Sequence, residues 1–240
     1  MKDVVGATSE EARMIKAIQR AVGALDNGYI GTQTLSDIAV KVGASCWPLN
    51  VELYGKPAII AKDIDPLNPN GSLPYNAISG SFSWQGKPCS ILIRDGKVIC
   101  GTACHYPNAP ESVLYRTKGG NIGIARAKSI MDDALARSEI IWAVGGMGLL
   151  GNYSPAAEGF TGSYSDVLRR TAHTVLGVKN GMLYGVYFKS LTASQVNDFC
   201  RDKLKLEKAI MLDGGHVAAI HGASSKINVG QKQFYAAKFI

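Results

Sequence analysis

The sequence predicts an α+β protein: an antiparallel, hairpin-rich sheet with a few packed helices, preceded by a small all-helical module. Two observations predict this class. After residue 75, turn signals of the Asp-Gly and Asn-Gly type separate apolar runs at several places, which is the strongest short-range indication of β-hairpins. Before residue 45, apolar residues instead recur at helical intervals. The two halves of the pattern therefore predict two different architectures in one chain.

The first part of the chain predicts a helix, a glycine-rich loop and a second helix. Thr8 and Glu11 have the spacing of a capping box, and apolar residues follow them at helical intervals. Segment 26–31 is rich in turn residues, and a second helical pattern comes after it. Such a unit is too small to bury a strong core alone. We therefore expect residues 1–45 and residues 46–240 to form separate domains.

The larger domain is expected to consist mainly of hairpins. Their turns are Asp95-Gly96, Gly119-Gly120-Asn121 and Asn180-Gly181, each between apolar runs. Two helices interrupt the strands, one over residues 125–138 and one that begins at Thr192, where Gln195 completes a capping box. A strand at 57–61 is expected within an otherwise irregular segment, 46–74.

Composition and charge restrict the class of partner. The formal net charge of +7 favours an anionic partner, which includes nucleic acid, a membrane surface and a polyanionic glycan. The basic residues are dispersed, so nucleic acid is not expected. No apolar run reaches the roughly 18 residues that a transmembrane helix needs. The start of the chain lacks the apolar core of a secretory signal, so we expect synthesis in the cytoplasm without a signal peptide.

The cysteines predict neither a disulfide framework nor a metal centre. There are five, an odd number with irregular spacing. Cys100, Cys104 and His105 lie close in sequence, but no second cysteine pair with zinc-ligand spacing accompanies them. We expect reduced, mostly structural thiols, with no metal and no cofactor.

The most informative stretch is the short apolar run 209–212, which ends at Asp213. It is typical of a buried strand bounded by a turn. Gly214 and Gly215 follow, and glycines allow a ligand to come close to the main chain. The pattern therefore presents a single carboxylate at the mouth of a buried strand. An ordinary Asp-Gly turn is the alternative interpretation.

The helical module resembles the peptidoglycan-binding-like domain of bacterial and phage cell-wall hydrolases. The resemblance rests on Ile18-Gln19-Arg20, on the loop 25–31 and on Thr34-Leu35. It implies that residues 1–45 bind cell-wall glycan. A plain helical hairpin packed on the main domain is the alternative.

Four segments of the larger domain resemble the phosphodiester glycosidase family in their order and spacing. They are residues 77–82, 143–150, 173–178 and 212–215. The resemblance spans about residues 56–222. It implies the hydrolysis of a sugar linked through C1 to a phosphate diester. Together with the first module, it implies an endolysin-like hydrolase that cleaves a glycosyl-phosphate or glycosidic bond in peptidoglycan or teichoic acid. Such a protein acts at the bacterial wall after release or as a virion component.

The expected site follows from this chemistry. A phosphate on an anomeric carbon leaves readily, so the site needs a carboxylate and cationic donors more than a strong acid. Asp213 is the expected carboxylate, and His173 and His216 are the other catalytic candidates. If the bond is an ordinary glycosidic one, Glu158 is the candidate for the second acid. The expected substrate-binding residues are Ser79, Gly80, Gly145, Gly146, Arg169, Arg170, Thr174, Gly214 and Gly215.

Three alternatives stay open. Asp213, His216 and His221 would together suit a metal ion. Departures from the family pattern favour a non-catalytic wall-binding or virion structural protein on a degenerate scaffold; they are Ser79, His173 and Val217. A cytosolic enzyme acting on nucleotide sugars would show no wall binding by residues 1–45.

Overall fold

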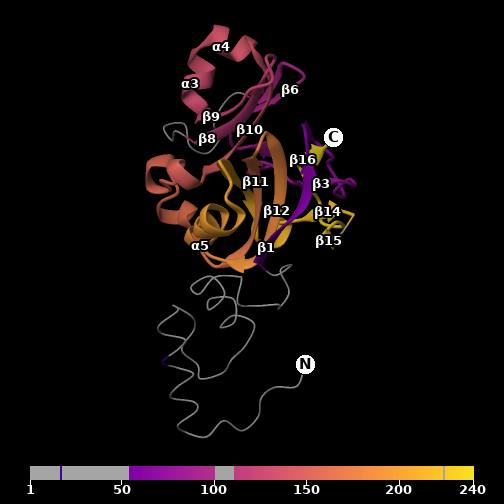
Figure 1. Cartoon of the computed structure of the whole chain (residues 1–240), viewed down its shortest axis with the longest axis vertical. Coiled ribbons are helices and arrows are strands. Elements are labelled where there is room, and N and C mark those ends of the chain that lie inside the picture. Colours follow the sequence, from indigo (N-terminus) through magenta and orange to yellow (C-terminus); the bar gives the residue numbers. More distant parts are fainter. Residues whose placement is uncertain (1–16, 18–53, 101–110, 224) are drawn as a thin grey trace, which may run out of the picture. The chain divides into compact units, whose positions relative to one another are not determined.

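The computed structural model describes residue 17 and residues 54–100, 111–223 and 225–240 (Figure 1). The predicted helical module, residues 1–45, lies outside the described residues apart from Ala17. From Gly55 onward the described residues belong to one unit. Its strands are antiparallel and its helices are few and short, which confirms the predicted α+β class.

The larger sheet has nine strands and contains the predicted hairpins (Figure 1). Seven strands follow one another in the order β1 (Tyr54–Ala61), β12 (Met182–Leu191), β11 (Thr171–Lys179), β13 (Lys208–Gly214), β10 (Ile140–Gly148), β6 (Leu92–Arg94) and β7 (Lys97–Cys100). A branch from β10 consists of β8 (Ser112–Thr117) and β9 (Ile122–Arg126). The strand ending at Asp213 is therefore central, with β11 on one side and β10 on the other.

A second sheet was not predicted from the sequence. Its five strands follow the order β15 (Ser225–Ile227), β14 (Ile220–Gly222), β3 (Ala77–Ser79), β16 (Ala236–Phe239) and β2 (Ile64–Leu67). Strand β2 lies within the segment that was expected to be irregular, so that expectation was wrong there. The separate hairpin of β4 (Ser83–Trp84) and β5 (Lys87–Pro88) follows β3.

The main core lies between these two sheets. Leu176 and Ile210 of the larger sheet share one buried apolar cluster with Ile78 and Phe239 of the smaller one. Gly185 of β12 lets the sheets approach closely, because a Cβ there would lie 2.7 Å from the Phe239 ring and 3.1 Å from Ile78 Cγ2. Each fully buried side chain of this size contributes about 1.5–3 kcal/mol through the hydrophobic effect.

One of the two predicted helices is interrupted. The stretch 125–138 forms two short helices, α3 (Ala127–Asp132) and α4 (Ala134–Ser138). Asp133 has an extended backbone, and its Oδ1 accepts a hydrogen bond of 2.9 Å from the Ala136 N–H. The aspartate therefore caps a new helix, as its preference for N-cap positions explains. The prediction of one continuous helix was wrong.

The second predicted helix is confirmed with its cap. Helix α5 (Ala193–Phe199) begins with the reciprocal capping box of Thr192 and Gln195. A π-helical turn, η6 (Cys200–Leu204), continues it. Three 3₁₀ segments connect β10 to β11: η3 (Leu150–Asn152), η4 (Ala156–Glu158) and η5 (Gly162–Leu168). Among the described residues, no helix combines the length and apolarity needed to cross a bilayer.

A buried carboxyl group, Glu111, lies at the start of β8 without a good hydrogen-bond partner. It is fully buried, and neither oxygen meets a donor in hydrogen-bond geometry. The pKa of Glu111 is raised to about 8, mainly by burial and also by the nearby charge of Glu158. The Ser90 hydroxyl opposes this shift only in part, because the pair lies outside good hydrogen-bond geometry. Glu111 is therefore protonated in the folded protein at neutral pH.

We expect Glu111 to make the protein less stable as the pH rises. Its folded pKa is raised, so its contribution is fully present below about pH 4.5 and is lost progressively up to about pH 8. The free energy of unfolding should fall by about 1.4 kcal/mol per pH unit within this window through this group alone. In Glu111→Gln this part of the slope should disappear, as measured by urea unfolding at several pH values. An unchanged slope in the variant would contradict the assignment.

Candidate active site

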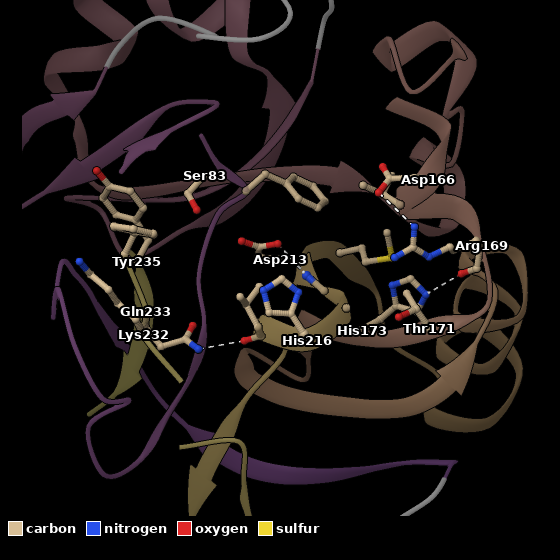
Figure 2. Close-up of a pocket in the computed structure, with 17 residues that line it drawn as sticks. Ser83, Asp166, Arg169, Thr171, His173, Asp213, His216, Lys232, Gln233 and Tyr235 are labelled. Atoms are coloured by element: carbon tan, nitrogen blue, oxygen red, sulfur yellow. Dashed lines mark hydrogen bonds and ion pairs between the residues drawn. The ribbon is translucent and has the colours of Figure 1, made fainter. Parts of the chain in front are cut away.

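A cavity of about 460 Å³ lies where β13 ends (Figure 2). Asp213 lies at its centre. One wall contains the C-terminal segment 232–235, and the opposite wall contains residues of η5 and the start of β11. Phe82 and Ser83 contribute from the β4 hairpin. Pockets of this size and mixed polarity are typical of small-molecule sites.

The position of Asp213 is fixed through its backbone. Its N–H donates to the Gly80 carbonyl oxygen over 2.9 Å, and its own carbonyl oxygen accepts from Thr174 Oγ1 over 2.7 Å. Its carboxylate Oδ1 accepts from the Gly214 N–H over 2.9 Å. Gly80 and Thr174 were predicted to contact substrate, but neither lines the cavity. They hold the strand that carries the carboxylate.

The carboxyl group of Asp213 titrates near neutrality. Burial raises its pKa to about 7, and the negative charge of Asp166 adds to the shift. Hydrogen bonds from the Gly214 N–H and the Ser83 side chain oppose it. At neutral pH both the acid and the carboxylate are populated, which suits a group that takes part in proton transfer.

His173 lies in the wall of the cavity and is neutral. It is 1% exposed, and burial lowers the pKa of its imidazole. Its Nε2 lies 2.9 Å from the Leu191 carbonyl oxygen. It also lies 3.3 Å from the Arg169 carbonyl oxygen, a contact drawn in Figure 2. Carbonyl oxygens only accept, so Nε2 carries the proton and Nδ1 is left as an acceptor near Gly214. This arrangement gives His173 a fixed ring orientation.

Three further cationic or titratable side chains line the cavity. His216 is exposed and lies beside Asp213 (Figure 2). The Nη1 of Arg169 is 3.3 Å from Asp166 Oδ2, so this pair is neutral overall. The Nζ of Lys232 lies 5.0 Å from the centre of the Phe234 ring. The cavity thus combines one titrating carboxyl group with several donors.

The structure places Glu158 elsewhere, which corrects its prediction as a second acid. Glu158 is fully buried and does not line the cavity. Its oxygens accept from the Ser112 N–H, the Ser112 hydroxyl and the Gly148 N–H, each over 3.0 Å. It also forms an ion pair with Arg126. A carboxylate so fully engaged joins β8, β9 and β10 and is not available to a substrate.

Four other predicted binding residues are absent from the cavity lining, and each has contacts elsewhere in the structure. The Ser79 hydroxyl donates to the Val217 carbonyl oxygen and accepts from the Ala219 N–H, both over 2.8 Å. A Cβ on Gly145 would lie 2.1 Å from Ser90 Oγ, and one on Gly146 would lie 2.5 Å from the Met211 carbonyl oxygen. These glycines allow close strand packing. The fourth residue is Arg170, whose Nη1 donates to the Ser190 carbonyl oxygen over 3.1 Å.

Six predicted residues do line the cavity: Arg169, His173, Asp213, Gly214, Gly215 and His216. Sequence reasoning missed Ser83, Asp166 and Lys232, which also line it. Ser83 directly follows segment 77–82, which resembles the phosphodiester glycosidase family, so the sequence did indicate this part of the chain. Asp166 lies in η5, a segment in which the sequence shows no recognisable motif. Lys232 lies after residue 222, where the resemblance to the phosphodiester glycosidase family ends.

The residues of the alternative metal site are not brought together. His221 Nδ1 lies 3.2 Å from the Leu73 carbonyl oxygen, and its ring packs edge-on against Tyr75 at 5.4 Å. His221 does not line the cavity with Asp213 and His216. Among the described residues, no three His, Cys, Asp or Glu side chains form a group that would hold a metal ion.

No family model matches the chain, and no curated protein matches it in sequence. Among solved structures, the catalytic domain of zebrafish N-acetylglucosamine-1-phosphodiester alpha-N-acetylglucosaminidase, auto-inhibited by its pro-peptide, is similar with a TM-score of 0.55 and 17% identity. The match covers 74% of this chain and 73% of that one. A hypothetical protein from Synechocystis is matched with a TM-score of 0.48 and 12% identity over 76% and 57% of the two chains. The first likeness shows that this chain has a phosphodiester-glycosidase-like fold.

Proposed function

We propose that this protein is a glycoside hydrolase that cleaves a glycosyl-phosphate or glycosidic bond in a bacterial cell-wall glycan, either peptidoglycan or teichoic acid, with Asp213 as the key carboxylate. The single observation that carries the proposal is a carboxyl group of pKa about 7 at the centre of a cavity that also contains cationic donors. The fold likeness to a phosphodiester glycosidase supports the same chemistry.

The cavity suits a glycosyl phosphate in particular. The bond between C1 and the phosphate oxygen breaks readily, because the negative charge that develops on the departing phosphate is spread over its oxygens. The site then needs a base that activates water, and the deprotonated form of Asp213 supplies it. The water oxygen bonds to C1, its proton passes to the Asp213 carboxylate, and the electron pair of the broken bond leaves with the phosphate. Cationic side chains stabilise the departing charge.

For an ordinary glycosidic bond a second carboxyl group is required. Asp166 is the candidate for this second carboxyl group, a role that the sequence had suggested for Glu158. It lines the same cavity as Asp213, and its charge acts on the Asp213 pKa.

The cell-wall part of the proposal rests on the sequence. Residues 1–45 resemble a peptidoglycan-binding-like module, and the formal net charge of +7 is suited to a polyanionic wall. An electrostatic contribution of this kind weakens with added salt. The proposed site of action is the bacterial wall, which the protein reaches after release or as part of a virion.

Replacing Asp213 by Asn should abolish hydrolysis without unfolding the protein. Asn has the same shape but cannot accept a proton, so kcat should fall by about 100-fold or more. The assay is the release of reducing sugar from purified walls and of phosphate monoester from a sugar phosphodiester. The matched control is Asp132→Asn, an exposed aspartate paired with Lys128 on α3. Equal activity in wild type and Asp213→Asn would remove Asp213 from the mechanism.

The Ser83 side chain should set the pH dependence of the reaction. The reactive form is the carboxylate, so activity should fall as the pH drops below about 7. The hydrogen bond from Ser83 lowers the pKa of Asp213. In Ser83→Ala the pKa should rise, and the acidic limb of the kcat/KM profile should move to higher pH. Ser138→Ala, in the exposed helix α4, is the control. A limb that stays in place would contradict the role of Ser83.

Wall binding should depend on residues 1–45. Purified walls should retain the full chain in a pull-down, and retention should decrease when the chain begins at residue 46 or when salt is raised. Retention of both chains to the same extent would contradict the role of the first module. Retention of the full chain without any product release would instead favour a non-catalytic wall-binding protein.

A further inference from the structure

The charges in the cavity are not equivalent toward an anionic ligand. Arg169 already pairs with Asp166 at 3.3 Å, so an anion near this guanidinium also meets the repulsion of the Asp166 carboxylate. Asp213, which lies between the two walls, adds a negative charge whenever it is ionised. His173 is neutral because burial lowers the pKa of its imidazole. The wall formed by η5 and β11 is therefore close to neutral.

The opposite wall holds a positive charge without a counter-ion. Lys232 lines the cavity, and no described carboxylate forms an ion pair with it. Its side chain is exposed, and its Nζ lies 5.0 Å from the centre of the Phe234 ring, where cation–π attraction favours this position of the ammonium. An aromatic ring does not neutralise a charge, so the ammonium stays available to an anion.

Hydrogen bonds hold the backbone that follows Lys232 in place. Gln233 exchanges backbone hydrogen bonds with Gly71, of 2.7 Å and 3.2 Å, and its Nε2 donates to the Val217 carbonyl oxygen over 2.9 Å (Figure 2). The Tyr235 carbonyl oxygen accepts from the Gly80 N–H over 2.8 Å. The same Gly80 accepts from the Asp213 N–H. One glycine thus connects the segment that carries Lys232 to the strand that carries the carboxylate.

We propose that Lys232 is the residue that selects an anionic leaving group, and that it binds the phosphate of the substrate on the wall opposite Arg169. This inference rests on the proposed function and deepens it. It orients the substrate: the phosphate faces the segment 232–235, while the sugar faces Thr171 and the pair of Arg169 and Asp166. That pair offers both donors and acceptors, which suits sugar hydroxyl groups.

The test compares two substrates that carry the same sugar, one with a phosphodiester leaving group and one with a neutral aryl leaving group. In Lys232→Gln, KM for the phosphodiester should rise by about tenfold, the effect of one lost hydrogen bond to a charged group. KM for the neutral substrate should stay within about twofold, since its leaving group carries no charge for Lys232 to bind. Lys232→Arg should restore most of the difference, because it keeps the charge. The matched control, Lys226→Gln, removes the same charge from an exposed strand residue that does not line the cavity.

Several outcomes separate this inference from the proposed function. A loss that is equal for both substrates, or no loss for either, would overturn the role of Lys232 even if the enzyme is active. If wild type hydrolyses neither substrate, the proposed function fails, and binding decides the inference. Calorimetry with N-acetylglucosamine 1-phosphate should then show weaker binding in Lys232→Gln than in Lys226→Gln. Equal binding by the two variants would overturn the inference.

Discussion

The pairing of β13 with β11 and β10 is the constraint on which the candidate site depends. A central strand has both of its backbone edges hydrogen-bonded, so its end is held more rigidly than a loop. Asp213 is the next-to-last residue of β13. The hydrogen bonds of its backbone to Gly80 and Thr174 hold this residue in place, and with it the position of the carboxyl group. The glycines of β10 are part of this arrangement, because a side chain at Gly146 would collide with the backbone of Met211.

The electrostatics of the cavity follow from this rigid placement. A carboxyl group that is partly removed from water binds its proton more tightly, and here the pKa reaches about 7. Two hydrogen bonds limit the shift, and a second carboxylate, Asp166, increases it. Opposite the wall that carries Arg169 and Asp166, the Lys232 ammonium lies 5.0 Å from the centre of an aromatic ring. In the proposed complex, the uneven distribution of charge across this cavity would give a sugar phosphate a preferred direction.

Buried carboxyl groups have different roles in this protein, although they look alike in sequence. Glu158 is satisfied by three hydrogen bonds and an ion pair, and it joins strands of the larger sheet. Glu111, one residue before β8, has no partner of good geometry and stays protonated. Asp213 is partly buried at a cavity and titrates near neutrality. The surroundings of each group decide its chemistry, and none of these surroundings is local in sequence.

The sequence alone determined the hairpins, the capping box of α5 and the strand that ends at Asp213, because turn dipeptides, caps and short apolar runs act between close neighbours. The order of recognised segments also predicted the fold that the solved-structure likeness supports. Only the tertiary structure decided which polar groups meet. It brought Ser83, Asp166 and Lys232 to Asp213 and moved Glu158 into the interior. The physical reason is that these contacts depend on how two sheets pack, and packing leaves no periodic pattern in the chain.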